Sequence, residues 1–169
     1  MGTTEVTPID RQSFRDAMSR LGAAVHVITS DGPAGRLGFT ASAVCSVSDS
    51  PATLLVCMNR NSEQNDPLRR NGVFCVNCLA GEQQDLSEMF AGYGGIAMRD
   101  RFDRQAWRTL TTGSPVLDGT LVSFDCRIAS TFEVATHTLL IGEVMSVRAG
   151  NYSNAALIYF QRQYHTLRA

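Results

Sequence analysis

Two neighbouring stretches of the chain carry polar side chains at spacings that suit a flat, anionic ligand. The first stretch begins at Gly38, and its hydroxyl-bearing residues are Thr40, Ser42, Ser46 and Ser48. Successive side chains of a β-strand point to opposite faces, so these even-numbered residues are expected on one face. The spacing predicts a face of small hydrogen-bonding groups over which a flat polar ligand can lie.

The second stretch is the polar turn Asn59-Arg60-Asn61-Ser62, which follows a continuous apolar run from Ala52 to Met58. Such a run is typical of a strand buried on both faces. A serine ahead of a short helix offers a hydroxyl and free backbone N–H groups to a phosphate, and the Arg60 guanidinium suits phosphate oxygens. Spacing alone leaves an alternative open, namely two amphipathic strands joined by a solvated turn with no ligand.

The order of these strings resembles the flavin-binding core of the short-chain flavin reductases. These are the reductase partners of two-component, flavin-dependent monooxygenases such as hydroxyphenylacetate, phenol and antibiotic-pathway hydroxylases. The resemblance begins with GFTASAVCSVS at 38–48 and CMNRNS at 57–62. It covers about residues 12–167, and the further matching segments are 74–79, 83–91, Arg101-Phe102, 114–119, 137–144 and 159–164.

The resemblance implies that the chain binds FAD or FMN together with NADH, with NADPH left open. Hydride then passes from the nicotinamide to flavin N5, so the implied site positions two rings and needs no catalytic nucleophile or base. Residues implied to follow the flavin from its ring edge to its phosphate are Thr40, Ala41, Ser42, Ser46, Val47, Ser48, Asn59, Asn61 and Ser62. Further implied contacts are Cys57, beneath the ring and not as a nucleophile, Asn77 and Leu79.

Two residues are candidates for the nicotinamide nucleotide. The imidazole of His137 can stack on the cofactor or form a hydrogen bond to it. Phe102, next to Arg101, matches the family pattern, and the alternative of a surface loop packed by its own aromatic side chains stays open for this segment. The family usually reads Gly-Asp-His where this chain has Ala135-Thr136-His137, so an acidic neighbour that would orient the ring is lost. The alternative of a hairpin-turn histidine without a role stays open.

The implied function is a cytoplasmic, homodimeric NAD(P)H-dependent flavin reductase that supplies reduced flavin to a partner monooxygenase. Two other hypotheses stay open. One is an oxidase of the same fold that retains its FMN, and the other is a non-catalytic flavin carrier or sensor. Reduction of added flavin by NADH separates the reductase from the carrier.

Composition argues against several other classes of protein. A net charge of −1 and a pI near 6.3 do not fit an electrostatic binder of nucleic acid or membranes. All fifteen cationic residues are arginine, which excludes Schiff-base lysines and lysine-dependent phosphate loops. The polar stretch Met1–Asp10 lacks the apolar core of a signal peptide, and no segment supplies about 18 apolar residues for a membrane helix.

The remaining chemistry-bearing residues are expected to be structural. The five cysteines are predicted to be small buried thiols of a reducing compartment; they are Cys45, Cys57, Cys75, Cys78 and Cys126. Core packing is favoured over a zinc or dithiol role for Cys75 and Cys78, because residues three apart on a strand face opposite sides. His26 is predicted to be a packed or edge histidine.

These residues are positioned by one domain over residues 1–169 that is mainly β with short helices. Predicted helices cover 11–21, capped by Asp10, 67–71 after a capping Asp66, and 83–91. Predicted strands besides the two above cover 24–30, 73–79, 121–130, 132–135 and 138–148, whereas 98–112 is expected to be irregular. Hairpin spacing indicates an antiparallel β-barrel, which the resemblance sharpens to the FMN-binding split barrel with Greek-key connections.

Overall fold

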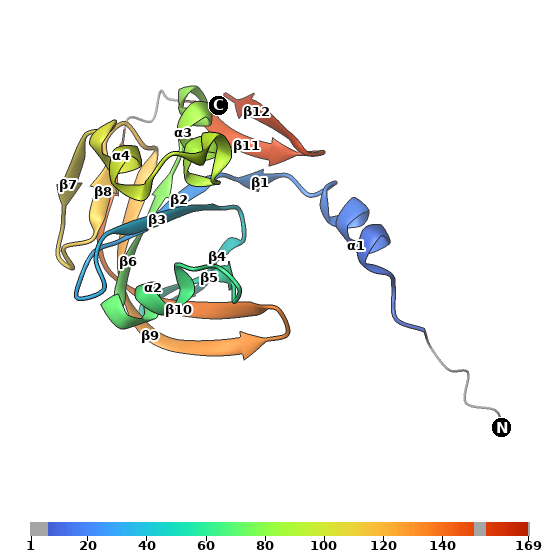
Figure 1. The fold of residues 1–169 in the computed structure, drawn as a ribbon, viewed down its shortest axis with the longest axis horizontal. Helices are drawn as coiled ribbons and strands as arrows, with labels where there is room; N and C mark the ends of the chain where they lie inside the picture. Colours follow the sequence, from blue (N-terminus) through green and yellow to red (C-terminus); the bar gives the residue numbers. More distant parts are fainter. Residues whose placement is uncertain (1–6, 151–154, 169) are drawn as a thin grey trace.

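The computed structural model describes residues 7–150 and 155–168 and is mainly antiparallel β with short helices (Figure 1). The helical elements are α1 (Arg11–Met18), α2 (Asn65–Asn71), η1 (Gly81–Gln83), α3 (Gln84–Phe90), η2 (Tyr93–Gly95) and α4 (Met98–Asp103). The strands are β1 (Ala23–Ala24), β2 (His26–Ser30), β3 (Leu37–Ala41), β4 (Val44–Asp49), β5 (Ala52–Asn59), β6 (Val73–Cys78), β7 (Trp107–Thr109), β8 (Pro115–Leu117), β9 (Val122–Val134), β10 (His137–Ala149), β11 (Ala156–Phe160) and β12 (Gln163–Leu167).

The main sheet has seven strands in the order β3-β2-β6-β9-β10-β5-β4, and it curls around an apolar core. Strands from both halves of the sheet supply that core, including Ile28 of β2, Val56 of β5 and Leu140 of β10. Figure 1 shows β2 and β3 facing β5 and β10 across it. The prediction of a mainly antiparallel β fold with short helices is confirmed, but the described strands do not close into a barrel, because β3 and β4 remain the two edges of the ladder.

The adjacent interior strands β2 and β6 are buried on both faces. Their inner faces line the core described above, and a second apolar cluster covers their outer faces. This second cluster joins Val27 of β2 to Phe90 of α3, Phe102 of α4 and Leu117 of β8. Every residue of β2 is therefore buried, including the polar His26, Thr29 and Ser30. The continuous apolar run of β5 predicted burial on both faces, but this is wrong, because buried residues of β5 alternate with half-buried ones.

Several element boundaries differ from the sequence prediction. A helix at 83–91 is confirmed in outline by α3, and the Asp10 cap of α1 is confirmed by a hydrogen bond from Ser13 N to Asp10 Oδ1 at 2.9 Å. The Asp66 cap is wrong, because α2 already begins at Asn65 and Asp66 lies in its first turn. The region 98–112 is not irregular, since it contains α4 and β7, and β12 was not predicted.

The predicted break between strands at 130–132 is also wrong. β9 runs unbroken to Val134 because Ser130, Thr131 and Phe132 pair with successive residues of β10. The hairpin turn lies at Ala135 and Thr136, where Ala135 adopts a φ of 48°. This longer hairpin places His137 at the first position of β10.

The cysteines are all free thiols, and Cys75, Cys78 and Cys126 are buried as predicted. Cys57 is half-buried, whereas Cys45 is exposed on the edge strand β4, so the prediction of burial is wrong for Cys45. Within 7–150 and 155–168, no helix combines the length and apolarity needed to cross a membrane.

His26 gives the fold a predictable dependence on pH. It is buried on β2, and its Nδ1 has no hydrogen-bond partner among the described residues. Burial lowers the pKa of His26 from 6.5 to about 4. The unfolded chain therefore binds a proton that the folded chain does not, and the free energy of unfolding falls by up to about 3 kcal/mol between these values.

We expect urea denaturation to show full stability above pH 6.5 and a falling midpoint as the pH decreases toward 4. The variant His26→Leu removes the titrating group and is expected to show a smaller decrease over the same interval. An identical pH dependence in both proteins would contradict the assignment to His26.

Candidate functional site

A cavity of about 430 Å³ opens where β3, the end of β5 and the start of β10 meet. Its volume falls in the range of ligand-binding pockets. Seven of the residues predicted from the sequence line this cavity: Thr40, Ala41, Ser42, Cys57, Asn59, Ser62 and His137. The fold thus collects hydroxyl, amide and imidazole groups from three separate segments around one space.

The pairing of β5 with β10 explains how these segments meet. His137 lies opposite Asn59 in the antiparallel ladder, and Leu139 lies opposite Cys57. Ala43, which follows β3, accepts a hydrogen bond from Cys57 N at 3.0 Å. The end of β5 therefore contributes Cys57 and Asn59, β10 contributes His137, and the end of β3 with the residues after it contributes the residues from Phe39 to Ala43.

The polar turn after β5 is built from its own hydrogen bonds. Asn59 Oδ1 accepts from Asn61 N at 2.9 Å, and Asn59 O accepts from Ser62 N at 3.1 Å. Ser62 Oγ accepts from Gln64 N at 3.3 Å. These bonds fix the Ser62 side chain at the cavity wall, where its hydroxyl proton can be donated to a ligand.

Gln64 is a cavity residue that sequence reasoning missed. Its Oε1 is buried without a hydrogen-bond partner among the described residues. A buried polar atom without a partner is costly, so a ligand hydroxyl or N–H that reaches this atom would be stabilised. The donors and acceptors of Ser62, Asn59 and Gln64 therefore fit the hydroxylated, phosphorylated chain of a flavin nucleotide.

Arg60 serves the hairpin and not the cavity. Its Nη1 donates to Ala135 O at 3.1 Å, and its guanidinium pairs with Glu133 at 3.0 Å. Its backbone N donates to Thr136 O at 3.0 Å. The guanidinium that lines the cavity belongs instead to Arg101, whose Nε donates to Ile96 O at 2.8 Å.

The ring of His137 has a hydrogen-bond partner next to it in the chain. Thr136 Oγ1 lies 2.9 Å from His137 Nδ1. A hydroxyl can donate to a neutral imidazole or accept from it, so Thr136 supports either tautomer. The sequence lacks the acidic neighbour that would orient the His137 ring, and the neutral hydroxyl of Thr136 takes over this role.

Cys57 is a neutral contact at the cavity wall. Burial raises the pKa of its thiol, and the nearby Cys45 acts in the same direction. The thiol therefore stays protonated near neutral pH and is a poor nucleophile. This agrees with a small contact beneath a ring and argues against a covalent role.

Asn77, predicted to contact the flavin, does not line this cavity and is completely buried on the outer face of the main sheet. Its Oδ1 accepts from Leu117 N at 2.9 Å and from Ser123 Oγ at 3.1 Å. Its Nδ2 donates to Val27 O and Thr29 Oγ1, both at 3.0 Å. Asn77 therefore links β2, β6, β8 and β9.

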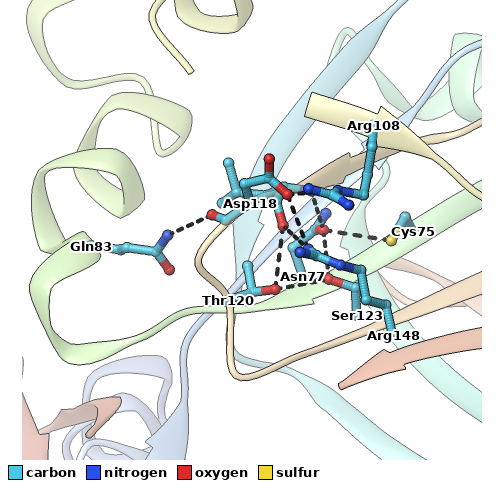
Figure 2. A network of polar contacts seen from close by, with 9 residues as sticks. Cys75, Asn77, Gln83, Arg108, Asp118, Thr120, Ser123 and Arg148 are labelled. Carbon is cyan, nitrogen blue, oxygen red and sulfur yellow. Dashed lines mark hydrogen bonds and ion pairs between the residues drawn. The ribbon is translucent and has the colours of Figure 1, made fainter. Parts of the chain in front are cut away.

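Figure 2 shows this network together with the ion pairs around Asp118. Asp118 Oδ1 pairs with Arg108 at 2.7 Å and with Arg148 at 3.1 Å, and its carbonyl accepts from Gln83 at 3.2 Å. The polar groups around Asn77 are thus satisfied within the protein. We therefore assign this network a structural role, in which it holds neighbouring strands together.

Two more predicted contacts, Leu79 and Phe102, also lie outside this cavity, and their roles stay predictions. Leu79 is completely buried and Phe102 is 3% exposed, both in the second apolar cluster. The Phe102 ring packs against Phe90 at 5.3 Å and Trp107 at 4.8 Å between centroids. Neighbouring side chains of a helix point in different directions, so Arg101 reaches the cavity while Phe102 does not.

Four predicted flavin contacts lie outside this cavity: Ser46, Val47, Ser48 and Asn61. The single polar face expected from Thr40 to Ser48 is interrupted, because β3 ends at Ala41 and β4 begins at Val44. A register shift between Ser46 and Ser48 also leaves Val47 55% exposed. Contacts of these four residues with a flavin stay predictions.

Comparison with known proteins gives a consistent result. Residues 18–168 match the family described as "Flavin reductase like domain". The chain is 53% identical over 160 residues to "FMN reductase (NADH) RutF" of Stutzerimonas stutzeri, covering 95% of this chain and 90% of that protein.

Solved structures that resemble this chain are also flavin reductases by their names. A crystal structure of a flavin reductase from Haemophilus somnus is 44% identical, with a TM-score of 0.89, and the match covers 94% of this chain and 100% of that one. The styrene monooxygenase flavin reductase of Pseudomonas putida is 26% identical, with a TM-score of 0.81 and coverages of 93% and 98%.

Proposed function

The chain belongs to the flavin reductase-like domain family, and from this premise we propose that it is an NADH-dependent reductase of FMN or FAD. The observation that carries the proposal is the cavity that gathers Thr40, Ser42, Ser62 and His137. The name of the relative from Stutzerimonas stutzeri supports FMN and NADH as the reacting pair.

The residues of the chain act by binding and orientation. Thr40, Ala41 and Ser42 border the ring, while Ser62 and Gln64 bind the ribityl and phosphate groups. Cys57 provides a small neutral contact that leaves room for the ring. When both nucleotides are bound they supply the hydride transfer to flavin N5. The walls of the cavity hold the two rings in contact and exclude water from them.

His137 is assigned to the nicotinamide nucleotide. We expect His137→Ala to raise the KM for NADH about tenfold with a smaller change in kcat, because it removes one oriented hydrogen bond. Thr136→Ala is expected to produce part of that increase, and Thr136→Ser to restore the normal value. An unchanged KM for NADH in His137→Ala would show that His137 is a turn residue without a role in NADH binding.

We extend the proposal to a homodimer, with the split barrel and its Greek-key connections as the subunit fold. All eight residues of α1 are exposed, including Phe14 at 54% and Met18 at 47%. Figure 1 shows α1 lying away from the sheet, so its apolar side chains are free to pack on a second copy.

Light scattering tests the dimer directly. We expect twice the mass of one chain for the natural protein and a larger monomer fraction for Phe14→Asp. A natural protein that is monomeric at micromolar concentration would contradict the homodimer.

Further parts of the proposal concern the partner protein, the domain organisation and the cellular location. A monooxygenase that receives the reduced flavin is supported by the name of the Pseudomonas putida relative. The family match over 18–168 supports a single functional domain. A cytoplasmic location fits the five free thiols, which remain reduced there.

The test of the proposed function is NADH and NADPH oxidation by the purified protein, first alone, then with FMN, then with FAD. Saturable oxidation of NADH or NADPH that requires added flavin supports the reductase. The rates then show which of NADH and NADPH, and which of FMN and FAD, the protein prefers. Oxidation without added flavin indicates a resident flavin, and flavin binding without NADH oxidation indicates a carrier.

A further inference from the structure

A hollow of about 430 Å³ lies between α2 and β9 and shares no lining residue with the flavin cavity. Figure 1 shows α2 beside the β9–β10 hairpin. We call it the α2–β9 hollow, and its lining residues are Asp66, Arg69, Arg70, Ile128, Ser130 and Thr131. All of these side chains except that of Ile128 can form hydrogen bonds, so the hollow suits a polar ligand.

An irregularity of β9 brings two hydroxyl groups into the hollow. Neighbouring side chains of a regular strand point to opposite faces, so Ser130 and Thr131 would not normally share one site. The ladder between β9 and β10 shifts register here, and Ala129, between Ile128 and Ser130, is left without a partner in it. Such a β-bulge bends the strand and changes the direction of its side chains. Both hydroxyl-bearing residues are half-buried, and their side chains form no hydrogen bond with another described residue.

Two guanidinium groups face these hydroxyls with N–H donors that remain available. Arg70 Nε lies 3.1 Å from Asp66 Oδ2, and Arg69 Nη1 lies 3.7 Å from Glu133 Oε1. The second distance is too long for a hydrogen bond. Within the described part of the chain, neither guanidinium donates a side-chain hydrogen bond. Guanidinium groups with available donors bind oxyanions through charge-assisted hydrogen bonds, and both of these side chains are open to solvent.

Asp66 gives the hollow a means of distinguishing between oxyanions. Its carboxylate is exposed at the hollow and faces Arg70 through one oxygen. An ionised carboxylate can only accept hydrogen bonds, so it repels an anion without protons and favours an anion that carries a hydroxyl group. Phosphate keeps at least one proton at neutral pH, whereas sulfate keeps none. The arrangement therefore favours phosphate over sulfate.

We propose that the α2–β9 hollow binds inorganic phosphate in its hydrogenphosphate form. The two guanidinium groups and the two hydroxyl groups donate to phosphate oxygens, and Asp66 accepts the hydrogen bond of the phosphate hydroxyl. This site is separate from the phosphate end of the flavin at Ser62, and it does not depend on the proposed function.

The first test titrates the full-length protein with sodium phosphate and follows the backbone amides by NMR at constant ionic strength, because salt screens exposed charges. We expect saturable shifts of the amides of Arg70, Ser130 and Thr131, and an affinity for sulfate that is about tenfold weaker. The positions of the shifting amides separate this site from phosphate binding near Ser62. Shifts confined to the flavin cavity, or equal affinities for phosphate and sulfate, would overturn the proposal.

The second test compares variants of exposed residues. Arg70→Gln is expected to weaken phosphate binding about tenfold, because it removes a charged donor. Arg127→Gln is the matched control, since Arg127 also lies on the surface, pairs with Glu143 at 2.7 Å and does not line the hollow. Equal weakening in these two variants would indicate general electrostatic attraction and overturn the site.

Asp66→Asn tests the selection of phosphate. The substitution keeps the size of the side chain, removes its negative charge and adds an N–H donor. We expect sulfate to bind this variant about as tightly as phosphate does. A preference for phosphate that is unchanged in Asp66→Asn would contradict the hydrogen bond from the phosphate hydroxyl and overturn the proposed form of the ligand.

Discussion

Replacing Asn77 by alanine is expected to lower the free energy of unfolding by more than about 3 kcal/mol while leaving the flavin affinity of the folded protein unchanged. The substitution removes the amide that Val27 O, Leu117 N and two hydroxyl groups bind in a completely buried position. Each buried polar group left without a hydrogen-bond partner costs about 1 to 3 kcal/mol, and this substitution leaves several such groups without a partner.

The measurement is urea denaturation followed by flavin titration under conditions where the variant is folded. Asn61→Ala is the matched control for stability, because Asn61 is exposed at the turn after β5 and its loss is expected to change stability little. A stable Asn77→Ala variant with weakened flavin affinity would restore Asn77 as a flavin contact and contradict its structural assignment.

Ser62→Ala is expected to weaken flavin binding about tenfold to a hundredfold with little change in stability. The hydroxyl is held at the cavity wall by the hydrogen bond from Gln64 N, and a hydrogen bond to a charged phosphate contributes about 1.5 to 3 kcal/mol. The loss should be similar for FMN and FAD, since both carry the phosphate next to the ribityl chain.

Quenching of flavin fluorescence measures this affinity. Ser130→Ala, on β9 away from the cavity, is the control, and Ser46→Ala tests the contact predicted for the exposed strand β4. An unchanged Kd in Ser62→Ala would refute the phosphate assignment. A larger loss of flavin affinity in Ser46→Ala than in Ser62→Ala would indicate that the phosphate binds beside β4 and not in the cavity.

Sequence patterns predicted the residues that lie where strands end. Asn59 and Ser62 follow an apolar strand, and His137 starts the strand that pairs with it. Antiparallel pairing of these two segments is enough to bring their polar ends to one edge. Spacing alone also indicated Thr40 and Ser42, and the resemblance to flavin reductases added Ala41. Thr40 and Ala41 lie on β3, which does not pair with β5, and Ser42 follows that strand.

Sequence patterns were less informative where a strand is buried on both faces or interrupted. Asn77, which the resemblance alone suggested as a flavin contact, lies in a continuous buried run, and nothing in such a run distinguishes the face toward the core from the face toward β8. Ser46 and Ser48 failed to continue the face of Thr40, because the strand breaks at Ser42 and the ladder shifts beside Val47. Period-2 reasoning assumes an unbroken ladder.

A second cavity, which adjoins the first and is lined in part by Tyr93, Tyr159 and Tyr164, depends on long-range pairing that local sequence patterns do not contain. Tyr159 reaches it because β11 pairs with β1 near the other end of the chain. Tyr164 follows because β12 pairs with β11. Tyr93 and Glu88 come from the chain around the end of α3, so the wall combines segments that no sequence window holds together.

The most direct test of the central claim is a single turnover without oxygen, in which the protein with FMN is mixed rapidly with NADH. We expect loss of the oxidised flavin absorbance at a rate that saturates with NADH and that slows when the transferred hydrogen of NADH is replaced by deuterium. FMN that binds in the cavity yet stays oxidised in the presence of NADH would contradict the account.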